Sequence, residues 1–318
     1  MYLTLFITSF LISVFTTYIY KNIWNLIHKE NKIPTGYGLL LILFFYLYSN
    51  FYNSTNPEII IFGIILLFSI IYWLDDLFHL PFIFRFLLQF ICGCAIATYL
   101  LIYVEQDVGY YFYTIVVFSG LSNIFLSNVI NFYDGLDLNI STFILILAIT
   151  FIFLIDESII NSKYSFIIIG FILGFSIFNL KADNIFFGDS GCFVIASFIN
   201  FLLIKSIITH NLNITYLIIP LALPIVDVLY VIIFRIYKKE SLLSRNYYHI
   251  YHQLESRFNN KTYLIPQIFN AVILIIISKI VINTNILDFK QNLIFVALSF
   301  LFTILAYIFL IKFLKLKR

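Results

Sequence analysis

The stretch of sequence that decides the fold is residues 190–209, which read SGCFVIASFINFLLIKSIIT. A helix needs about 20 residues to cross the hydrocarbon core of a bilayer. This stretch has that length, and Lys205 is its single charged residue. We therefore predict a membrane-spanning α-helix whose leading edge carries the polar motif Phe187-Gly188-Asp189-Ser190-Gly191.

The rest of the chain repeats this pattern. Apolar residues make up 62% of the 318 residues, charged residues make up 11%, and the mean hydropathy is +1.01, which lies far outside the range of soluble globular proteins. We predict an all-α, polytopic transmembrane helical bundle, forming one integral membrane domain over residues 1–318 with a cytoplasmic loop near 237–263. The eleven predicted spans are 2–20, 37–52, 59–74, 84–103, 110–130, 139–155, 164–180, 190–209, 214–236, 264–282 and 292–312.

Basic residues are distributed unevenly between the two sides of this bundle. An odd number of spans puts the chain ends on opposite sides. With the amino end outside, fifteen of the 19 lysines and arginines lie in inner loops or the carboxyl-terminal tail. Because Lys and Arg favour cytoplasmic loops, we expect the amino terminus outside and the carboxyl terminus in the cytoplasm. The four residues on the outer side are Lys163, Lys205, Lys279 and Lys290.

Composition also excludes some classes of function. The net charge of +3 is small and the basic residues form no continuous stripe, so nucleic-acid binding is not expected. The cysteines Cys92, Cys94 and Cys192 lie in or beside apolar runs, where a thiol behaves as a small hydrophobic group. We therefore predict no disulfide or zinc framework.

Four polar clusters interrupt the apolar chain, and the predicted topology places them all on the inner side. The first, Asp75-Asp76, puts two adjacent carboxylates at the end of the third predicted span. Like charges this close repel unless a cation or a shared proton relieves them. A solvated helix end explains one aspartate more easily than two, so this pair alone leaves both interpretations open.

The second cluster spaces Asn131, Asp134 and Asp137 at i, i+3 and i+6. A helical segment would align these groups along one side, and Gly135 would let the backbone approach a ligand. Such a row suits a nucleotide or a metal-bound diphosphate. An Asx-rich turn between two spans is the alternative.

The third and fourth clusters carry a carboxylate and two imidazoles. Asp189 lies between two glycines, in a pattern that fits an oxygen ligand of Mg²⁺ or Mn²⁺ but also an ordinary turn or helix N-cap. His249 and His252 follow Arg245 in the large inner loop. Imidazole and guanidinium groups are natural partners of phosphate oxygens, although such a loop could also rest on anionic lipid headgroups. Asp227, inside the ninth span, is expected to pair with a basic residue or to line a cavity mouth.

Together these segments resemble the polyprenyl-phosphate N-acetylhexosamine-1-phosphate transferases, of the glycosyltransferase family 4 type. The resemblance implies that the phosphate of undecaprenyl phosphate attacks the β-phosphorus of a UDP-N-acetylhexosamine on the cytoplasmic face of a bacterial inner membrane, releasing UMP. It implies Mg²⁺ as cofactor, with Mn²⁺ as an alternative. The matching segments are Leu74-Asp75-Asp76-Leu77 with Arg85 and Gln89, residues 131–137, Asn179 with residues 185–191, and His249-Ile250-Tyr251-His252.

The resemblance also assigns expected roles to single residues. Asp189 would coordinate the metal, the Asp75-Asp76 pair would orient or deprotonate the lipid phosphate, and the histidines would neutralise phosphate charge. The implied catalytic residues are Asp75, Asp76, Asp134, Asp137, His249 and His252; the implied substrate-binding residues are Asn131, Asn179, Phe187 and Arg245; and the implied metal ligand is Asp189.

The chain departs from the family pattern at three motifs. The family's glycine-rich first loop is reduced here to Gly36-Tyr37-Gly38. The family's His-Ile-His-His reads His249-Ile250-Tyr251-His252, and its Pro-Ala-Lys reads Ala182-Asp183-Asn184. The histidine pattern is closer to the branch that initiates O-antigen, common-antigen or capsule synthesis than to the peptidoglycan branch.

Other functions and partners remain open from the sequence. A secondary transporter or a lipid-linked glycan flippase is the alternative, although such carriers tend to place ionisable groups near the bilayer midplane. The expected partners are a UDP-N-acetylhexosamine, undecaprenyl phosphate and the lipid bilayer, and a homodimer is left open. The sequence does not select the sugar.

Overall fold

The computed structural model describes residues 1–27, 33–52, 57–78, 81–103, 109, 111–154, 162–180, 185–209, 214–241, 247–258, 261–283 and 289–314. Every regular element in these residues is helical, and they contain no strand. The helices are α1 (Tyr2–Ile27), α2 (Leu39–Tyr52), α3 (Pro57–Phe78), α4 (Phe82–Tyr103), α5 (Tyr111–Asn131), α6 (Asn139–Leu154), α7 (Ser162–Asn179), α8 (Gly188–Ile208), α9 (Ile214–Tyr237), α10 (Ile250–Phe258), the 3-10 helix η1 (Lys261–Leu264), α11 (Ile265–Asn283) and α12 (Phe289–Phe313).

Each of the eleven predicted spans corresponds to one of these helices. Nine helices of the described chain are long and apolar enough to cross a membrane, whereas α2 and α6 are apolar but shorter. The all-α, polytopic membrane fold is therefore confirmed, and the side of the membrane that each terminus faces stays a prediction. The predicted inner loop is more structured than a linker, because it contains α10 and η1.

Internal contacts divide the chain into two compact units. The first consists of Met1–Leu145 and Glu157–Asn211, and the second of Ile146–Asp156 and Leu212–Arg318. One of the boundaries along the chain, between residues 145 and 146, falls inside α6. The three acidic clusters belong to the first unit and the histidine cluster belongs to the second.

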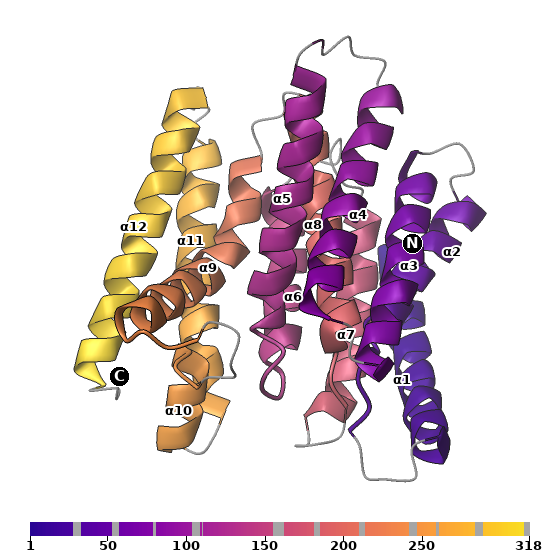
Figure 1. Cartoon of the computed structure of the whole chain (residues 1–318), viewed down its shortest axis with the longest axis horizontal. Helices are drawn as coiled ribbons and strands as arrows, with labels where there is room; N and C mark the ends of the chain where they lie inside the picture. The colour runs from indigo at the N-terminus through magenta and orange to yellow at the C-terminus, as the bar shows by residue number, and fades with distance from the viewer. Residues whose placement is uncertain are drawn as a thin grey trace. The chain divides into compact units, whose positions relative to one another are not determined.

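The central helix of the first unit is α8, which contacts α2, α3, α4 and α5 (Figure 1). It is apolar on all sides, and nearly all of its residues are buried, as expected for a helix surrounded by other helices. Its Asn200 amide donates to Ser119 Oγ of α5 at 2.9 Å, a polar contact between neighbouring helices. This burial fixes the position of Asp189 in the first turn of α8.

The second unit is built on α9, which contacts both α11 and α12 (Figure 1). Pro220 and Pro224 lie inside α9, where neighbouring helices can satisfy the freed backbone groups. Just after the helix ends at Tyr237, Lys239 adopts the left-handed conformation, and the Glu240 N–H donates to the Arg235 carbonyl at 2.9 Å. This turn starts the loop that leads to His249.

Candidate active site

Arg85 joins carboxylates from two of the predicted clusters. Its Nε lies 3.3 Å from Asp75 Oδ2, at the end of α3, and its Nη1 lies 3.0 Å from Asp189 Oδ2, in the first turn of α8. Asp75 is buried, whereas the Asp189 side chain is 32% exposed. One guanidinium therefore offsets the repulsion between two carboxylates, and one of these carboxylates is accessible to a ligand.

The second cluster reaches the same place through the start of α8. The Gly188 N–H donates to Asp134 Oδ2 at 2.6 Å, and Gly188 has a φ of 85°, a conformation that favours glycine. The amide of Asn131 approaches the Asp189 carboxylate. The structure thus brings all three acidic clusters to one end of the first unit.

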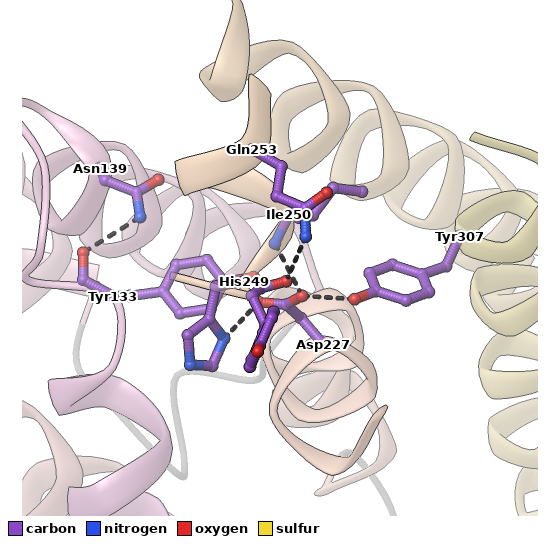
Figure 2. Close-up of polar contacts among 8 residues, drawn as sticks. Tyr133, Asn139, Asp227, His249, Ile250, Gln253 and Tyr307 are labelled. Carbon is purple, nitrogen blue, oxygen red and sulfur yellow. Dashed lines mark hydrogen bonds and ion pairs between the residues drawn. The ribbon is translucent and has the colours of Figure 1, made fainter. Parts of the chain in front are cut away.

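The second cluster is not a helix face, however. Helix α5 ends at Asn131 and residues 132–138 form turns. Asn131, Asp134 and Asp137 therefore do not line one face of a helix, and the alternative of a turn between two spans is observed. The turn is stabilised locally, because the Asn139 amide donates to the Tyr133 carbonyl at 3.1 Å (Figure 2). Asp137 lies in this turn and is partly exposed.

Asn179 connects the two loops that carry the acids. Its Oδ1 accepts the N–H of Leu138 at 2.7 Å, and its Nδ2 donates to the Ile185 carbonyl at 2.7 Å. Leu138 has a φ of 58°, so this bond supports an unusual backbone conformation. Both ends of the Asn179 amide contact backbone, and its predicted contact with substrate stays a prediction.

The first loop of the chain pairs with the segment before α8. The Phe186 N–H donates to the Pro34 carbonyl at 2.9 Å, and the Gly38 N–H donates to the Phe187 carbonyl at 3.0 Å. The Phe187 side chain is buried and packs edge-on against Phe175, with ring centroids 5.5 Å apart. Phe187 therefore positions the backbone that leads to Asp189, and its predicted substrate contact is not tested.

A hydrogen-bonded network of Tyr72, Gln89 and Asn128 lies near the acids, since Tyr72 interacts electrostatically with Asp75 and Asp189. The Gln89 amide donates to the Tyr72 hydroxyl at 2.7 Å, and the Asn128 amide donates to Gln89 Oε1 at 3.2 Å. Tyr72 also stacks on Phe193 of α8, with centroids 4.8 Å apart. The sequence motifs include Arg85 without a role and do not include Tyr72. The available signal was helical spacing, because Tyr72 lies one turn before Asp75 and Arg85 lies one turn before Gln89.

The histidine cluster is organised by Asp227 in the second unit (Figure 2). Asp227 is fully buried in α9, and its Oδ2 lies 2.8 Å from Nδ1 of His249. The pairing of Asp227 with a basic side chain, one of the two expected arrangements, is therefore observed. His252 is partly exposed on α10, and the centroid of its ring lies 4.4 Å from the centroid of the Tyr251 ring.

Two predicted site residues cannot be placed further. Arg245 lies outside the described residues, and for Asp76 the structure describes the backbone at the end of α3 but not the side chain. In the second unit, Tyr248 donates a hydrogen bond of 3.0 Å to Glu240, and this contact raises the pKa of the Tyr248 hydroxyl above its usual range.

The described residues contain no group of three or more His, Cys, Asp or Glu side chains that could hold a metal by themselves. Mg²⁺ does not require such a group, because it commonly takes one or two carboxylates and completes its shell with water and substrate phosphates. Asp189 offers a partly exposed carboxylate, with Asp75 joined to it through Arg85. This hard-oxygen donor set fits a small divalent cation that arrives with a phosphorylated substrate.

The comparison with protein families covers the acidic part of this site. Residues 58–207 match the family described as Glycosyl transferase family 4. The match includes Asp75, Asp134 and Asp189 and ends before the histidine cluster. It supports a membrane-embedded transferase that moves a sugar phosphate to a polyprenyl phosphate, at this general level. No curated protein matches the chain.

Proposed function

We propose that this protein transfers an N-acetylhexosamine-1-phosphate from a UDP-sugar to undecaprenyl phosphate. An oxygen of the lipid phosphate attacks the β-phosphorus of the UDP-sugar, the bond from this phosphorus to the bridging oxygen breaks, and UMP leaves. The observation that carries the proposal is the joining of Asp75 and Asp189 by Arg85 within the segment that matches the glycosyl transferase family.

The chemistry of phosphoryl transfer fits these residues. Such reactions depend on positioning and on neutralising charge more than on covalent help from the protein. The Arg85 guanidinium is a rigid fork that suits phosphate oxygens as well as carboxylates. Asp189 would hold Mg²⁺, or Mn²⁺, and the bound ion would offset the negative charge of the diphosphate. Asp75 and Asp76 would orient the lipid phosphate.

The remaining roles follow from the polar turn and the histidine cluster. Asn131, Asp134 and Asp137 would hold the nucleotide, and His249, His252 and Arg245 would contact phosphate oxygens. The bias of Lys and Arg across the predicted spans supports a site on the cytoplasmic face of a bacterial inner membrane. The histidine pattern favours an enzyme that initiates O-antigen, common-antigen or capsule synthesis.

The direct test is release of UMP by the purified protein. Protein in detergent or nanodiscs is given Mg²⁺, undecaprenyl phosphate and, one at a time, a panel of UDP-N-acetylhexosamines. We expect UMP and a lipid diphosphate sugar with at least one donor, and their loss when the lipid or the cation is omitted. The sugar that reacts fastest identifies the donor.

The matched variants are Asp189→Asn and Glu255→Gln, each of which removes one carboxylate charge. Asp189→Asn is expected to lower turnover by roughly 100-fold or more, because it removes a charge at the reacting phosphates. Glu255→Gln, on α10, should leave turnover unchanged. Absence of UMP with every donor, in protein with a cooperative thermal transition, would refute the proposed activity.

A further inference from the structure

The carboxylate of Asp227 is fully buried within α9, in a part of the helix that is long and apolar enough to span a membrane. A charged group in such a position is costly unless it is paired, and it usually has a functional reason. Three hydrogen-bond donors surround the Asp227 carboxylate (Figure 2). They are Nδ1 of His249 at 2.8 Å from Oδ2, the Ile250 N–H at 3.0 Å from Oδ1, and the Tyr307 hydroxyl at 2.5 Å from Oδ1.

Two of these contacts hold the start of α10. This helix begins at Ile250, and the first N–H groups of a helix have no partner within the helix. The Asp227 carboxylate supplies one from a different helix, at the end of α10 where the helix dipole favours a negative charge. The third contact, from Tyr307, ties the same carboxylate to α12.

Helix α9 also holds the other side of the loop. Arg235, two turns after Asp227, donates to the Ser241 carbonyl and lies 3.9 Å from the Glu240 carboxylate. The described residues on either side of 242–246 are therefore fastened to one helix by two of its charged side chains. This arrangement positions His249 through contacts that come from α9.

The contact to His249 also determines where the imidazole carries its proton. An ionised carboxylate can only accept hydrogen bonds, so Nδ1 of His249 must be the donor. The neutral ring is then the Nδ1–H tautomer, and any hydrogen bond or proton exchange with a substrate phosphate goes through Nε2. The ring plane is fixed as well, because it stacks on Tyr251 with centroids 5.4 Å apart and an angle of 12°.

We propose that Asp227 is a positioning residue that sets the tautomer and orientation of His249 and fastens the start of α10 to α9 and α12. The use of Nε2 toward a phosphate rests on the proposed function. The tautomer itself does not, and it can be measured without any turnover.

The first experiment is nitrogen NMR on the full-length protein in nanodiscs, labelled with ¹⁵N-histidine. The chain has five histidines, and His249→Gln identifies the signal of His249 by its disappearance. We expect the wild-type ring as the Nδ1–H tautomer at a pH where it is neutral. In Asp227→Asn the side chain can present an amide donor to Nδ1, and the signal should move to the Nε2–H tautomer. Tyr307→Phe removes one bond to the carboxylate and should keep the Nδ1–H signal.

The second experiment measures turnover and its pH dependence. Asp227→Asn should lower kcat by about 10- to 100-fold with a smaller effect on KM, and it should shift the pH profile. Asp227→Glu should restore part of the loss, and Glu255→Gln should change neither quantity.

The two measurements separate the possible failures. A wild-type Nε2–H tautomer, or a tautomer that Asp227→Asn leaves unchanged, overturns the positioning role whatever the activity. If the variant does not fold, the wild-type spectrum still decides the question. If wild-type protein shows the Nδ1–H tautomer but releases no UMP, the proposed function fails and the positioning role stands.

Discussion

At the residue scale, Arg85 joins the carboxylates of the candidate acidic site. Two of its three guanidinium nitrogens contact carboxylates from α3 and α8, at 3.3 and 3.0 Å. A guanidinium can serve two acceptors at once because its donors point in fixed, different directions. An ammonium group is a compact point charge and cannot hold two separate carboxylates in the same geometry. The shape of this side chain therefore matters in addition to its charge.

Arg85→Lys tests that distinction. We expect turnover to fall on the order of 100-fold, because the positive charge remains but Asp75 and Asp189 are no longer held together. Thermal stability should change little, since the Arg85 side chain is 37% exposed. Turnover per folded protein and the melting temperature are measured on the same preparation.

Arg257→Lys, an exposed arginine on α10, is the control for the chemical change itself. It should leave turnover unaltered. Equal rates for Arg85→Lys and wild-type protein would show that charge alone is sufficient at residue 85.

At the element scale, the site is assembled by loops that bond to one another. The first loop pairs with residues 186 and 187, Asn179 joins the 132–138 turn to Ile185, and Asp134 accepts the N–H of Gly188. The loops require close contact. A Cβ atom on Gly38 would lie 2.3 Å from the Cα of Gly191. The two backbones therefore leave no room for a side chain at residue 38, and we expect a change in this loop to disturb the start of α8.

Gly38→Ala is expected to disturb this assembly. The added methyl group meets the Gly191 backbone and the Phe187 ring, and we expect destabilisation by about 1–3 kcal/mol with a loss of turnover. Thermal unfolding in detergent and UMP release per folded protein measure the two effects.

Gly63→Ala provides the comparison within α3. A Cβ there meets Tyr46 at 3.4 Å, an ordinary contact, and alanine is the better helix former. Stability should be retained or slightly raised. If both alanine variants behave alike, the close contact of the first loop with α8 has no energetic weight.

At the scale of the whole molecule, α3 and α8 of the first unit run antiparallel and carry charge at both ends. Asp75 and Asp189 lie at one end with Arg85. At the other end, Lys205 Nζ lies 3.3 Å from Glu58 Oε1, and Tyr164 donates to Glu58 Oε2 at 3.0 Å. The chemical site and this second ion pair are thus separated by the length of the helices.

Lys205→Met should therefore affect stability without affecting catalysis. Removing the ammonium from a carboxylate that is only 6% exposed is expected to cost roughly 1–3 kcal/mol, less than for a fully buried pair because Lys205 keeps some exposure. Turnover per folded protein should match wild type. Thermal unfolding and UMP release are the two readouts.

The double variant Glu58→Gln with Lys205→Met tests the cause of that loss, and with Glu58→Gln alone it forms a double-mutant cycle. It should be more stable than Lys205→Met alone, because the carboxylate charge is removed together with its partner. A large loss of turnover in folded Lys205→Met would contradict the separation of the two ends.

Much of this molecule was predictable from its sequence. Continuous apolar runs of bilayer length can only be helices in lipid, because each helix satisfies its own backbone hydrogen bonds. All eleven runs are helices, and the acidic residues at their edges could be identified as one candidate site because they alternate with the spans in a regular order. The residue that each polar side chain contacts in the folded protein could not be predicted from the sequence.

Helices could be predicted and side-chain partners could not, because the two depend on residues at different separations along the chain. Helix formation depends on neighbours within about four residues, so composition and length determine it. The joining of Asp75 to Asp189, the pairing of Asp227 with His249, and the turn that replaces the expected row at Asn131 depend on residues far apart in the chain. These contacts follow from how helices pack and where loops meet. The chain alone thus determined a helical membrane protein with a candidate acidic site, and only the tertiary structure decided that Arg85 joins Asp75 to Asp189 and that Asp227 pairs with His249.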